Sequence, residues 1–228
     1  MPTPLSSDGV LSDCLSEAEL KTIKGLTCFV VEDLRTARRF LSQAGWRGRI
    51  EELELYELSE HTSSQQAESL VHLLDDGRSV GLLSEAGLPA VADPGAALIA
   101  KCHTEGIRVV PFSGPSSLML ALMSSGLNGQ SFAFCGYLPA KTPQRRKAIC
   151  EVEKTSVRLN QSQIFIETPY RNDSMLADLL ECCKDDTKLC IAMDITSGDE
   201  MIRTKTIGQW KKQIPQLGKR PCVFILYA

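Results

Sequence analysis

Short apolar runs alternate with amphipathic segments along the first half of the chain. Residues 27–31 and 80–83 are apolar runs of strand length, and 50–56 shows a partial alternation of apolar and polar positions. Residues 107–112 form a further apolar run that reads as a strand. Helix-start signals follow or precede each run. Strands that alternate with helices in this way predict a mostly parallel sheet with helices on both faces.

Capping signals place the helices of this half. Ser16 and Glu19 form a capping box, which predicts a helix that ends at Gly25. Asp33 is predicted to cap a basic helix that runs to Gly45. A third helix is expected to begin at a Thr62/Gln65 capping box and to end at 76–77. A fourth is expected to be capped by Asp93, to begin with Pro94 and to end near His103.

Apolar runs lie closer together in the second half. Helices are predicted over 117–123, over 144–154, from Thr168-Pro169 to about Cys182, and near 209–213. Strands are predicted at 132–137, 163–167, 189–193, 201–206 and 222–227. This spacing favours hairpins and a mixed sheet. We therefore expect an α/β protein with two domains: 1–112 with a mostly parallel sheet, and 113–228 with a mixed sheet.

Composition limits the class of protein and its environment. The chain has 228 residues, of which 43% are hydrophobic and 23% charged, as in ordinary globular proteins. Its apolar runs are shorter than the roughly twenty residues of a membrane span, and its first residues lack the regions of a signal peptide. Nine cysteines without framework spacing favour a reducing cytoplasm over a disulfide scaffold. We expect a cytoplasmic protein with no membrane partner.

The balance of charge gives no bulk attraction for nucleic acid, because the net charge is −3. Basic residues nevertheless form three local clusters: Arg35, Arg38 and Arg39; Lys141, Arg145, Arg146 and Lys147; and Lys219 with Arg220. Each cluster alone is explained by a solvated helix face or helix end. Several clusters that converged on one surface would form a phosphate-binding site, so both interpretations stay open.

Two loops rich in proline and glycine carry most of the chemical information. They are Ser84-Glu85-Ala86-Gly87-Leu88-Pro89-Ala90-Val91-Ala92-Asp93-Pro94-Gly95 and Ser113-Gly114-Pro115-Ser116-Ser117. Glycine lets a backbone approach a ligand closely, Glu85 can accept hydrogen bonds, and Ser116 and Ser117 lie at a helix start with free N–H groups. Because parallel strands end at the edge of the sheet where ligands bind, the two loops together predict a small-molecule site. Well-capped turns would explain either loop alone.

Other common sites are not supported by the spacing of residues. The sequence has neither a G-x-G-x-x-G nor a G-x-x-x-x-G-K-[ST] motif, so a dinucleotide or P-loop site is not indicated. It has no G-x-S-x-G nucleophile elbow. The three histidines, His61, His72 and His103, are scattered along the chain. We therefore expect no metal site.

Charged residues also follow two of the predicted strands. Glu32-Asp33-x-Arg35 follows the strand at 27–31, and Glu167-Thr168-Pro169-Tyr170-Arg171 ends the strand at 163–167. In the second motif a carboxylate, an aromatic ring and a guanidinium could bind a hydroxyl, a base and a phosphate. Helix capping and a surface ion pair explain both motifs as well, so a structural role is the alternative.

Taken in their order along the chain, these motifs resemble those of the tetrapyrrole-methylase superfamily of S-adenosylmethionine-dependent enzymes, which are also called class III methyltransferases. Within this superfamily they are most similar to the branch of ribosomal small-subunit methyltransferase I. Segments 84–89 with 93–95, 113–116, 136–139 and 167–171 match that branch's loops in order, and 32–35 is similar to its Glu-Asp-Thr-Arg. Residues 1–5 resemble the loop after its first strand, so that strand is expected to be missing. Glu85, Leu88 and Ser113 depart from the branch's Asp, Thr and Pro, and 193–198 differs from its Arg-Glu-Leu-Thr.

The resemblance implies two α/β domains, S-adenosylmethionine in the cleft between them, and a homodimer. It implies cofactor contacts at Pro4, Glu85, Ala86, Gly87, Pro89, Val91, Ser116, Ser117 and Pro221. On the substrate side it implies Glu32, Arg35, Glu167 and Arg171, with no assigned base.

The activity expected from the resemblance is methyl transfer to RNA, with a ribose 2′-hydroxyl of small-subunit rRNA as the acceptor. One alternative keeps the fold and the cofactor but has a small-molecule acceptor such as a tetrapyrrole. Another is a cofactor-binding module without transfer activity. Arginines and lysines that converge around the cleft would favour RNA, whereas a closed apolar cavity would favour the small molecule.

Overall fold

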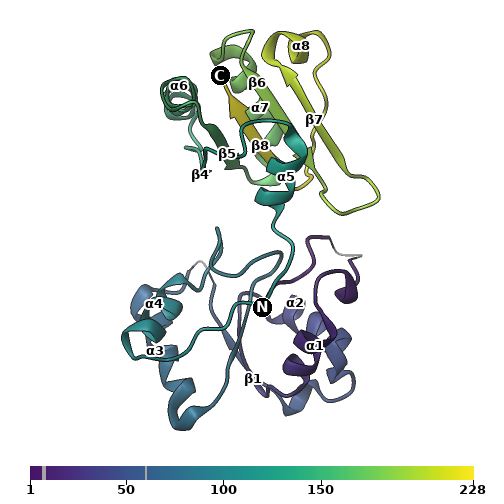
Figure 1. Cartoon of the computed structure of the whole chain (residues 1–228), viewed down its shortest axis with the longest axis vertical. Helices are drawn as coiled ribbons and strands as arrows, with labels where there is room; N and C mark the ends of the chain where they lie inside the picture. Colours follow the sequence, from purple (N-terminus) through teal and green to yellow (C-terminus); the bar gives the residue numbers. More distant parts are fainter. Residues whose placement is uncertain (7–8, 60) are drawn as a thin grey trace. The chain divides into compact units, whose positions relative to one another are not determined.

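The computed structural model of the chain describes residues 1–6, 9–59 and 61–228, which form two compact units (Figure 1). Unit 1 is Met1–Ser116 and unit 2 is Ser117–Ala228. Each unit has its own sheet and its own hydrophobic core. The division falls after Ser116, whereas the sequence predicts a boundary after residue 112.

Unit 1 is built on a three-stranded parallel sheet in the order β2-β1-β3. The strands are β1 (Cys28–Val31), β2 (Glu54–Glu57) and β3 (Gly81–Leu83). All four residues of β1 are buried, because β1 is the central strand and helices cover both of its faces. The predicted parallel sheet of the N-terminal half is confirmed.

The helices of unit 1 divide between the two faces of the sheet. Their bounds are η1 (Leu11–Asp13), α1 (Glu17–Lys24), α2 (Leu34–Leu41), the π-helical η2 (Ser42–Trp46), η3 (Ile50–Glu52), α3 (Ser64–Ser69), η4 (Leu70–Gly77) and α4 (Ala96–Thr104). Residues of η1, α1 and α2 pack with Phe29 and Val31. Residues of α3, η4 and α4 pack with Cys28 and Val30 on the other face.

The predicted strand at 107–112 is wrong. These residues have no strand assignment, and β3 pairs with β1 alone in the described sheet. Val110 is 54% exposed, so this apolar run does not occupy a buried central position. A run of apolar residues becomes a strand only where a neighbouring strand supplies hydrogen bonds. Ile107 N–H instead donates to the carbonyl of Cys102 in α4 at 2.8 Å, and no strand pairs with 107–112 among the described residues.

Helix capping in unit 1 follows the sequence at some positions and departs from it at others. The Ser16/Glu19 box and the Asp33 cap are present as predicted. The second capping box is formed by Ser63 and Gln66, one residue later than predicted. Thr62 does not cap that helix, because its hydroxyl accepts a hydrogen bond from Ser59 N–H at 3.0 Å in the preceding turn.

Unit 2 is built on a five-stranded sheet in the order β4-β5-β8-β6-β7. The strands are β4 (Phe132–Tyr137), β5 (Ser162–Ile166), β6 (Lys188–Met193), β7 (Met201–Thr206) and β8 (Cys222–Tyr227). β4 and β5 are parallel and the other neighbours are antiparallel, which confirms the predicted mixed sheet.

The helices of unit 2 are α5 (Ser117–Ser125), α6 (Thr142–Leu159), η5 (Pro169–Arg171), α7 (Asn172–Cys182) and α8 (Ile207–Lys212). The main core gathers apolar residues of α6, α7 and α8 on one face of the sheet, and Figure 1 shows α5 on the other. Phe165 and Phe224 stack there with ring centroids 5.6 Å apart. The helix predicted at 144–154 is longer, because Pro143 fits its first turn and Asn160 ends it in the left-handed conformation.

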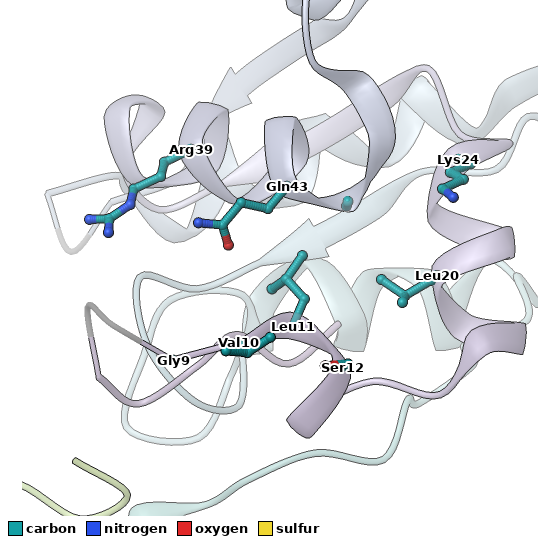
Figure 2. A pocket seen from close by; sticks show the side chains of 9 residues that line it. Gly9, Val10, Leu11, Ser12, Leu20, Lys24, Arg39 and Gln43 are labelled. Atoms are coloured by element: carbon teal, nitrogen blue, oxygen red, sulfur yellow. The ribbon is translucent and has the colours of Figure 1, made fainter. Parts of the chain in front are cut away.

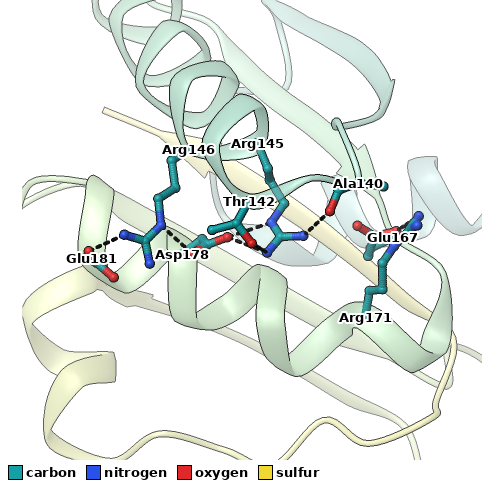
Figure 3. Close-up of polar contacts among 8 residues, drawn as sticks. All are labelled: Ala140, Thr142, Arg145, Arg146, Glu167, Arg171, Asp178 and Glu181. Atoms are coloured by element: carbon teal, nitrogen blue, oxygen red, sulfur yellow. Dashed lines mark hydrogen bonds and ion pairs between the residues drawn. The ribbon is translucent and has the colours of Figure 1, made fainter.

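A buried ion pair fixes the start of α6 (Figure 3). Arg145 and Asp178 are each 3% exposed, and Arg145 Nε donates to Asp178 Oδ2 at 2.7 Å. Arg145 also donates to the carbonyl of Ala140 at 2.9 Å, while Asp178 Oδ1 accepts from Arg146 at 2.7 Å. Buried charges are tolerated when they are paired and hydrogen-bonded in this way. The segment between β4 and α6 is thereby tied to α7.

We predict that Asp178→Ala strongly destabilises unit 2, since it leaves the Arg145 charge buried and unpaired. The expected loss in free energy of unfolding is about 3–5 kcal/mol. The measurement is urea denaturation followed by fluorescence in a Trp46→Phe background, in which Trp210 in the core of unit 2 is the remaining tryptophan. Asp185→Ala, which removes an exposed pair with Lys211, is the control and should cost less than about 1 kcal/mol. Equal losses in the two variants would contradict this interpretation of the buried pair.

Candidate functional site

The loop between β3 and α4, residues 84–95, has an unusual backbone. Gly87 and Gly95 have φ angles of 78° and 124°, and Ala90 and Ala92 both lie at 64°. An L-residue other than glycine in this left-handed region costs roughly 1–2 kcal/mol. Residues held in such conformations cluster at ligand-binding and catalytic sites, so the observed strain supports a functional role for the loop.

Three segments of unit 1 pack closely against one another, and glycines lie at the points of contact. Thr3 and Gly87 exchange two backbone hydrogen bonds, 2.9 Å from Thr3 N to Gly87 O and 3.1 Å from Gly87 N to Thr3 O. A Cβ atom on Gly87 would lie 3.1 Å from Leu5 Cδ2, and one on Gly114 would lie 2.2 Å from Pro2 Cγ. We call residues 2–5, 84–95 and 113–116 the loop cluster. It includes both proline- and glycine-rich loops singled out in the sequence.

Two carboxylates hold the backbone of this cluster. Glu32, directly after β1, accepts a hydrogen bond from Glu85 N–H at 2.8 Å. Glu19 accepts one from Ser113 N–H at 2.9 Å while its other oxygen accepts from Ser16. Each charge-assisted bond ties one loop to a core element of unit 1. In this structure Glu32 therefore serves to position the Glu85 backbone.

Asp93 does not cap α4, contrary to the sequence-based prediction. Gly95 occupies the cap position, and Asp93 is hydrogen-bonded with Ser84. The pKa of Asp93 is raised to about 7, mainly by burial and in addition by the nearby charges of Glu32 and Glu85, while the hydrogen bond with Ser84 opposes the increase. The cap was mispredicted because the side chain is used within the loop instead of at the helix end.

In unit 2, Glu167 organises the turn between β5 and α7. It is 4% exposed, and its Oε1 accepts from Thr168 N at 2.7 Å and Thr168 Oγ1 at 3.2 Å. The same atom accepts from Arg171 Nε at 2.9 Å and Nη2 at 2.6 Å (Figure 3). Thr168 is the N-cap residue of η5, but its hydroxyl donates to Glu167 and makes no capping hydrogen bond. Hydrogen bonds from Arg171 to Glu167 raise the pKa of the guanidinium.

Five buried polar atoms have no hydrogen-bond partner in the described part of the chain. They are Thr3 Oγ1 and Ser6 Oγ in unit 1, and Ser162 Oγ, Glu167 Oε2 and Asn172 Oδ1 in unit 2. The amide of Asn172 donates to the Arg220 carbonyl at 2.7 Å, which links the Glu167 turn to the residue before Pro221. An unpaired buried polar atom costs about 1–3 kcal/mol, so a ligand that supplied donors to these acceptors would be favoured.

The structure gathers many of the predicted site residues, but in two separate sets. Unit 1 brings together Pro4, Glu32, Glu85, Ala86, Gly87, Pro89, Val91 and Ser116 in or beside the loop cluster. Unit 2 contains Ser117 at the start of α5 and joins Glu167 and Arg171 through Asn172 to the Pro221 segment. Arg35 is exposed on α2.

Several residues of the predicted basic clusters form ion pairs with carboxylates of the same unit. Arg145 is buried against Asp178, and Arg146 contacts both Asp178 and Glu181. Arg220 is paired with Asp194. Three of the residues considered for phosphate binding therefore have carboxylate partners within unit 2.

A pocket of about 460 Å³ lies elsewhere in unit 1 (Figure 2). Its lining side chains include Leu11, Leu20, Lys24, Arg39 and Gln43. Arg39 belongs to a predicted basic cluster, but none of the residues predicted to contact the cofactor or the substrate lines this pocket. The loop cluster is therefore the better candidate for a site in this unit.

Residues 1–6, 9–59 and 61–228 contain few groups suited to other kinds of site. No group of three or more His, Cys, Asp or Glu residues there is placed to hold a metal ion. All nine cysteines are free thiols. Among the helices that the structure describes, none is both long enough and apolar enough to cross a membrane.

Several residues of the site were missed by sequence reasoning. Thr3, Glu19 and Asn172 contribute the loop bridge, the second loop anchor and a buried acceptor, respectively. The sequence indicates Glu19 only as part of a capping box, and no pattern in it predicts the hydrogen bond that its second carboxylate oxygen accepts from Ser113. Thr3 and Asn172 are recognisable only from tertiary contacts.

The fold, two compact α/β units of which one has a parallel sheet and the other a mixed sheet, has counterparts among solved structures. The crystal structure of a diphthine synthase matches with a TM-score of 0.68 at 16% identity, covering 96% of this chain and 85% of that one. The uroporphyrin-III C-methyl transferase of Thermus thermophilus, complexed with S-adenyl homocysteine, matches with a TM-score of 0.55 at 14% identity, covering 94% and 91%. These likenesses confirm the predicted fold class.

The family model described as Tetrapyrrole (Corrin/Porphyrin) Methylases matches residues 13–211, and the chain belongs to this family of methyltransferases. The ribosomal RNA small subunit methyltransferase I of Vibrio cholerae serotype O1 is 32% identical over 203 residues, covering 89% of this chain and 66% of that protein. The protein of the same name from Escherichia coli O157:H7 is 31% identical over 229 residues, covering 99% and 76%. The chain thus spans 66% and 76% of the lengths of these relatives. The resemblance inferred from the sequence is confirmed.

The raised pKa of Asp93 predicts a pH-dependent stability of unit 1. In the unfolded chain an aspartate has its ordinary pKa of 3.8, whereas in the fold the pKa of Asp93 is about 7. The fold therefore binds the proton more tightly, and the contribution of Asp93 to stability falls as the pH rises from about 4 to 7. Urea denaturation followed by circular dichroism should show Asp93→Asn more stable, relative to wild type, at pH 8 than at pH 5. A difference independent of pH would contradict the raised pKa.

Proposed function

We propose that this chain is an S-adenosylmethionine-dependent methyltransferase that methylates a ribose 2′-hydroxyl of small-subunit rRNA. The observation that carries the proposal is the loop cluster, in which strained alanines and closely packed glycines form a fixed backbone surface at the end of a parallel sheet. The names of the similar Vibrio and Escherichia proteins support rRNA as the acceptor.

The proposed cofactor contacts are Pro4, Glu85, Ala86, Gly87, Pro89, Val91 and Ser116 in unit 1, and Ser117 and Pro221 in unit 2. The residues present fit this cofactor, since its ammonium, adenine amine and ribose hydroxyls are donors for unpaired acceptors such as Thr3 Oγ1 and Glu167 Oε2. When bound, the cofactor supplies an electrophilic methyl group on its sulfonium sulfur. The protein's contribution is then mainly to bind and orient the reactants.

On the acceptor side we propose Glu32, Arg35, Glu167 and Arg171. Arg35 is exposed on α2, where its guanidinium can contact a phosphate. Glu32 and Glu167 bind protein donors, so their proposed role is to position the Glu85 backbone and the Arg171 side chain. A homodimer and a cytoplasmic location complete the proposal, in keeping with the family resemblance and an rRNA acceptor.

A tetrapyrrole or similar small molecule is the second candidate acceptor. It is supported by the family description and by the likeness of the fold to a uroporphyrin-III C-methyl transferase. A cofactor-binding module without transfer activity is the third candidate. These alternatives differ in where a transferred methyl group is found.

We predict that Gly87→Ala weakens binding of S-adenosylmethionine at least tenfold in calorimetric titration. The added Cβ would lie 3.1 Å from Leu5 Cδ2, at a φ of 78°, and would displace the loop from Thr3. Gly106→Ala is the matched control, because it has a similar φ of 68° but no atom within 4 Å of its Cβ. The control should bind the cofactor as the wild type does. Equal affinity of the two variants would argue against cofactor contact at Gly87.

The acceptor is tested by supplying isotopically labelled S-adenosylmethionine with small ribosomal subunits, naked rRNA and a tetrapyrrole mixture in parallel. We expect label in the rRNA, recovered as a 2′-O-methylated nucleoside by mass spectrometry. Label in the tetrapyrrole fraction would support the second candidate. Cofactor binding without transfer to any acceptor would support the third.

A further inference from the structure

Two exposed tyrosines and an arginine lie at the carboxyl ends of β4 and β5. Tyr170 is 67% exposed and Tyr137 is 54% exposed. The Arg171 guanidinium lies over the Tyr170 ring, with 5.3 Å between Cζ and the ring centroid. We propose that these three residues, the Tyr137–Tyr170–Arg171 platform, stack against an unpaired base of the RNA acceptor. This inference rests on the proposed function and names the part of the protein that selects single-stranded RNA.

The end of β4 is irregular directly before Tyr137. The register between β4 and β5 shifts between Phe134 and Tyr137, and Gly136 has a φ of 65°. An irregularity of this kind changes the direction of the side chains that follow it. Tyr137 then pairs with Ile166, the residue before Glu167, so the two tyrosines approach the same turn from neighbouring strands.

The platform is rigid because buried ion pairs hold both turns beneath it. Glu167 fixes the guanidinium of Arg171 through Nε and Nη2, and the Arg171 side chain keeps 25% of its surface exposed. Arg145 fixes the other turn through Asp178 and the Ala140 carbonyl (Figure 3). The pKa of Arg171 is raised by its hydrogen bonds to Glu167 and additionally by the charges of Tyr170 and Tyr137, in keeping with their proximity.

The charge of unit 2 suits an anionic polymer. Residues 117–228 contain 15 lysines and arginines and 11 aspartates and glutamates, although the whole chain has a net charge of −3. Lys141, the residue before α6, is exposed four positions after Tyr137. Aromatic faces beside cations bind unpaired bases without strong sequence preference, whereas a base inside a duplex cannot reach them.

The test measures methyl transfer to small ribosomal subunits by wild type and variants. Tyr170→Ala and Tyr137→Ala should each raise the KM for the subunits about tenfold, as expected for loss of one stacking contact. The Kd for S-adenosylmethionine should not change, and Tyr170→Phe should restore the KM to within about twofold, because the ring is retained. The matched control is Phe132→Ala, which removes an exposed aromatic ring at the other end of β4 and should leave the KM unchanged.

An unchanged KM in both alanine variants, with an active wild type, would overturn the platform while leaving the proposed function intact. If wild type methylates no RNA, the proposed function fails, and the platform is judged by fluorescence anisotropy with a labelled single-stranded RNA. In that assay Tyr170→Ala must weaken binding about tenfold. Equal affinity of the variant and wild type, or no binding by either, would overturn the platform as well.

Discussion

The loop between β3 and α4 has a backbone that the chain would not adopt by itself, and the site depends on what holds it there. Ala90 and Ala92 lie in the left-handed region, which costs roughly 1–2 kcal/mol per residue. Within the loop, Ala90 N–H donates to the Pro94 carbonyl at 3.2 Å. The hydrogen bond from Glu85 N–H to Glu32 and the paired backbone bonds between Thr3 and Gly87 supply the compensating contacts. A loop fixed in this way presents its N–H groups and glycines to a ligand with little further loss of conformational entropy on binding.

In unit 2, the turns of the candidate site are held by ion pairs, whereas in unit 1 the loop has a strained backbone. Glu167 with Arg171 and Asp178 with Arg145 fix the two strand-to-helix turns that follow β5 and β4. Both carboxylates are almost fully buried, so each pair persists only because its hydrogen bonds are nearly all satisfied. The exception is Glu167 Oε2, which has no partner among the described residues. Unsatisfied groups inside an otherwise complete network are typical of places where a ligand binds.

Sequence reasoning succeeded where one local pattern decided the outcome. The bounds of β4, β7 and β8 were predicted correctly, and β4 and β8 are apolar runs of strand length bounded by turn residues. It failed at 107–112 and at Asp93, because pairing of a strand and use of a carboxylate depend on neighbours distant in sequence. The loops of the candidate site were found from their glycines and prolines. Their anchors, Thr3 and Glu19, were not, since neither has a signal apart from the fold.

The central claim is that S-adenosylmethionine binds to the loop cluster, and hydrogen-exchange mass spectrometry tests it most directly. Amide exchange would be compared with and without saturating cofactor, since bound ligand suppresses local opening. We expect slower exchange in residues 2–5 and 84–95 of unit 1 and in 167–172 of unit 2, with exchange in α3 and α8 unchanged. If calorimetry confirmed saturation with cofactor while exchange in residues 84–95 stayed unaltered, binding of the cofactor to the loop cluster would be contradicted.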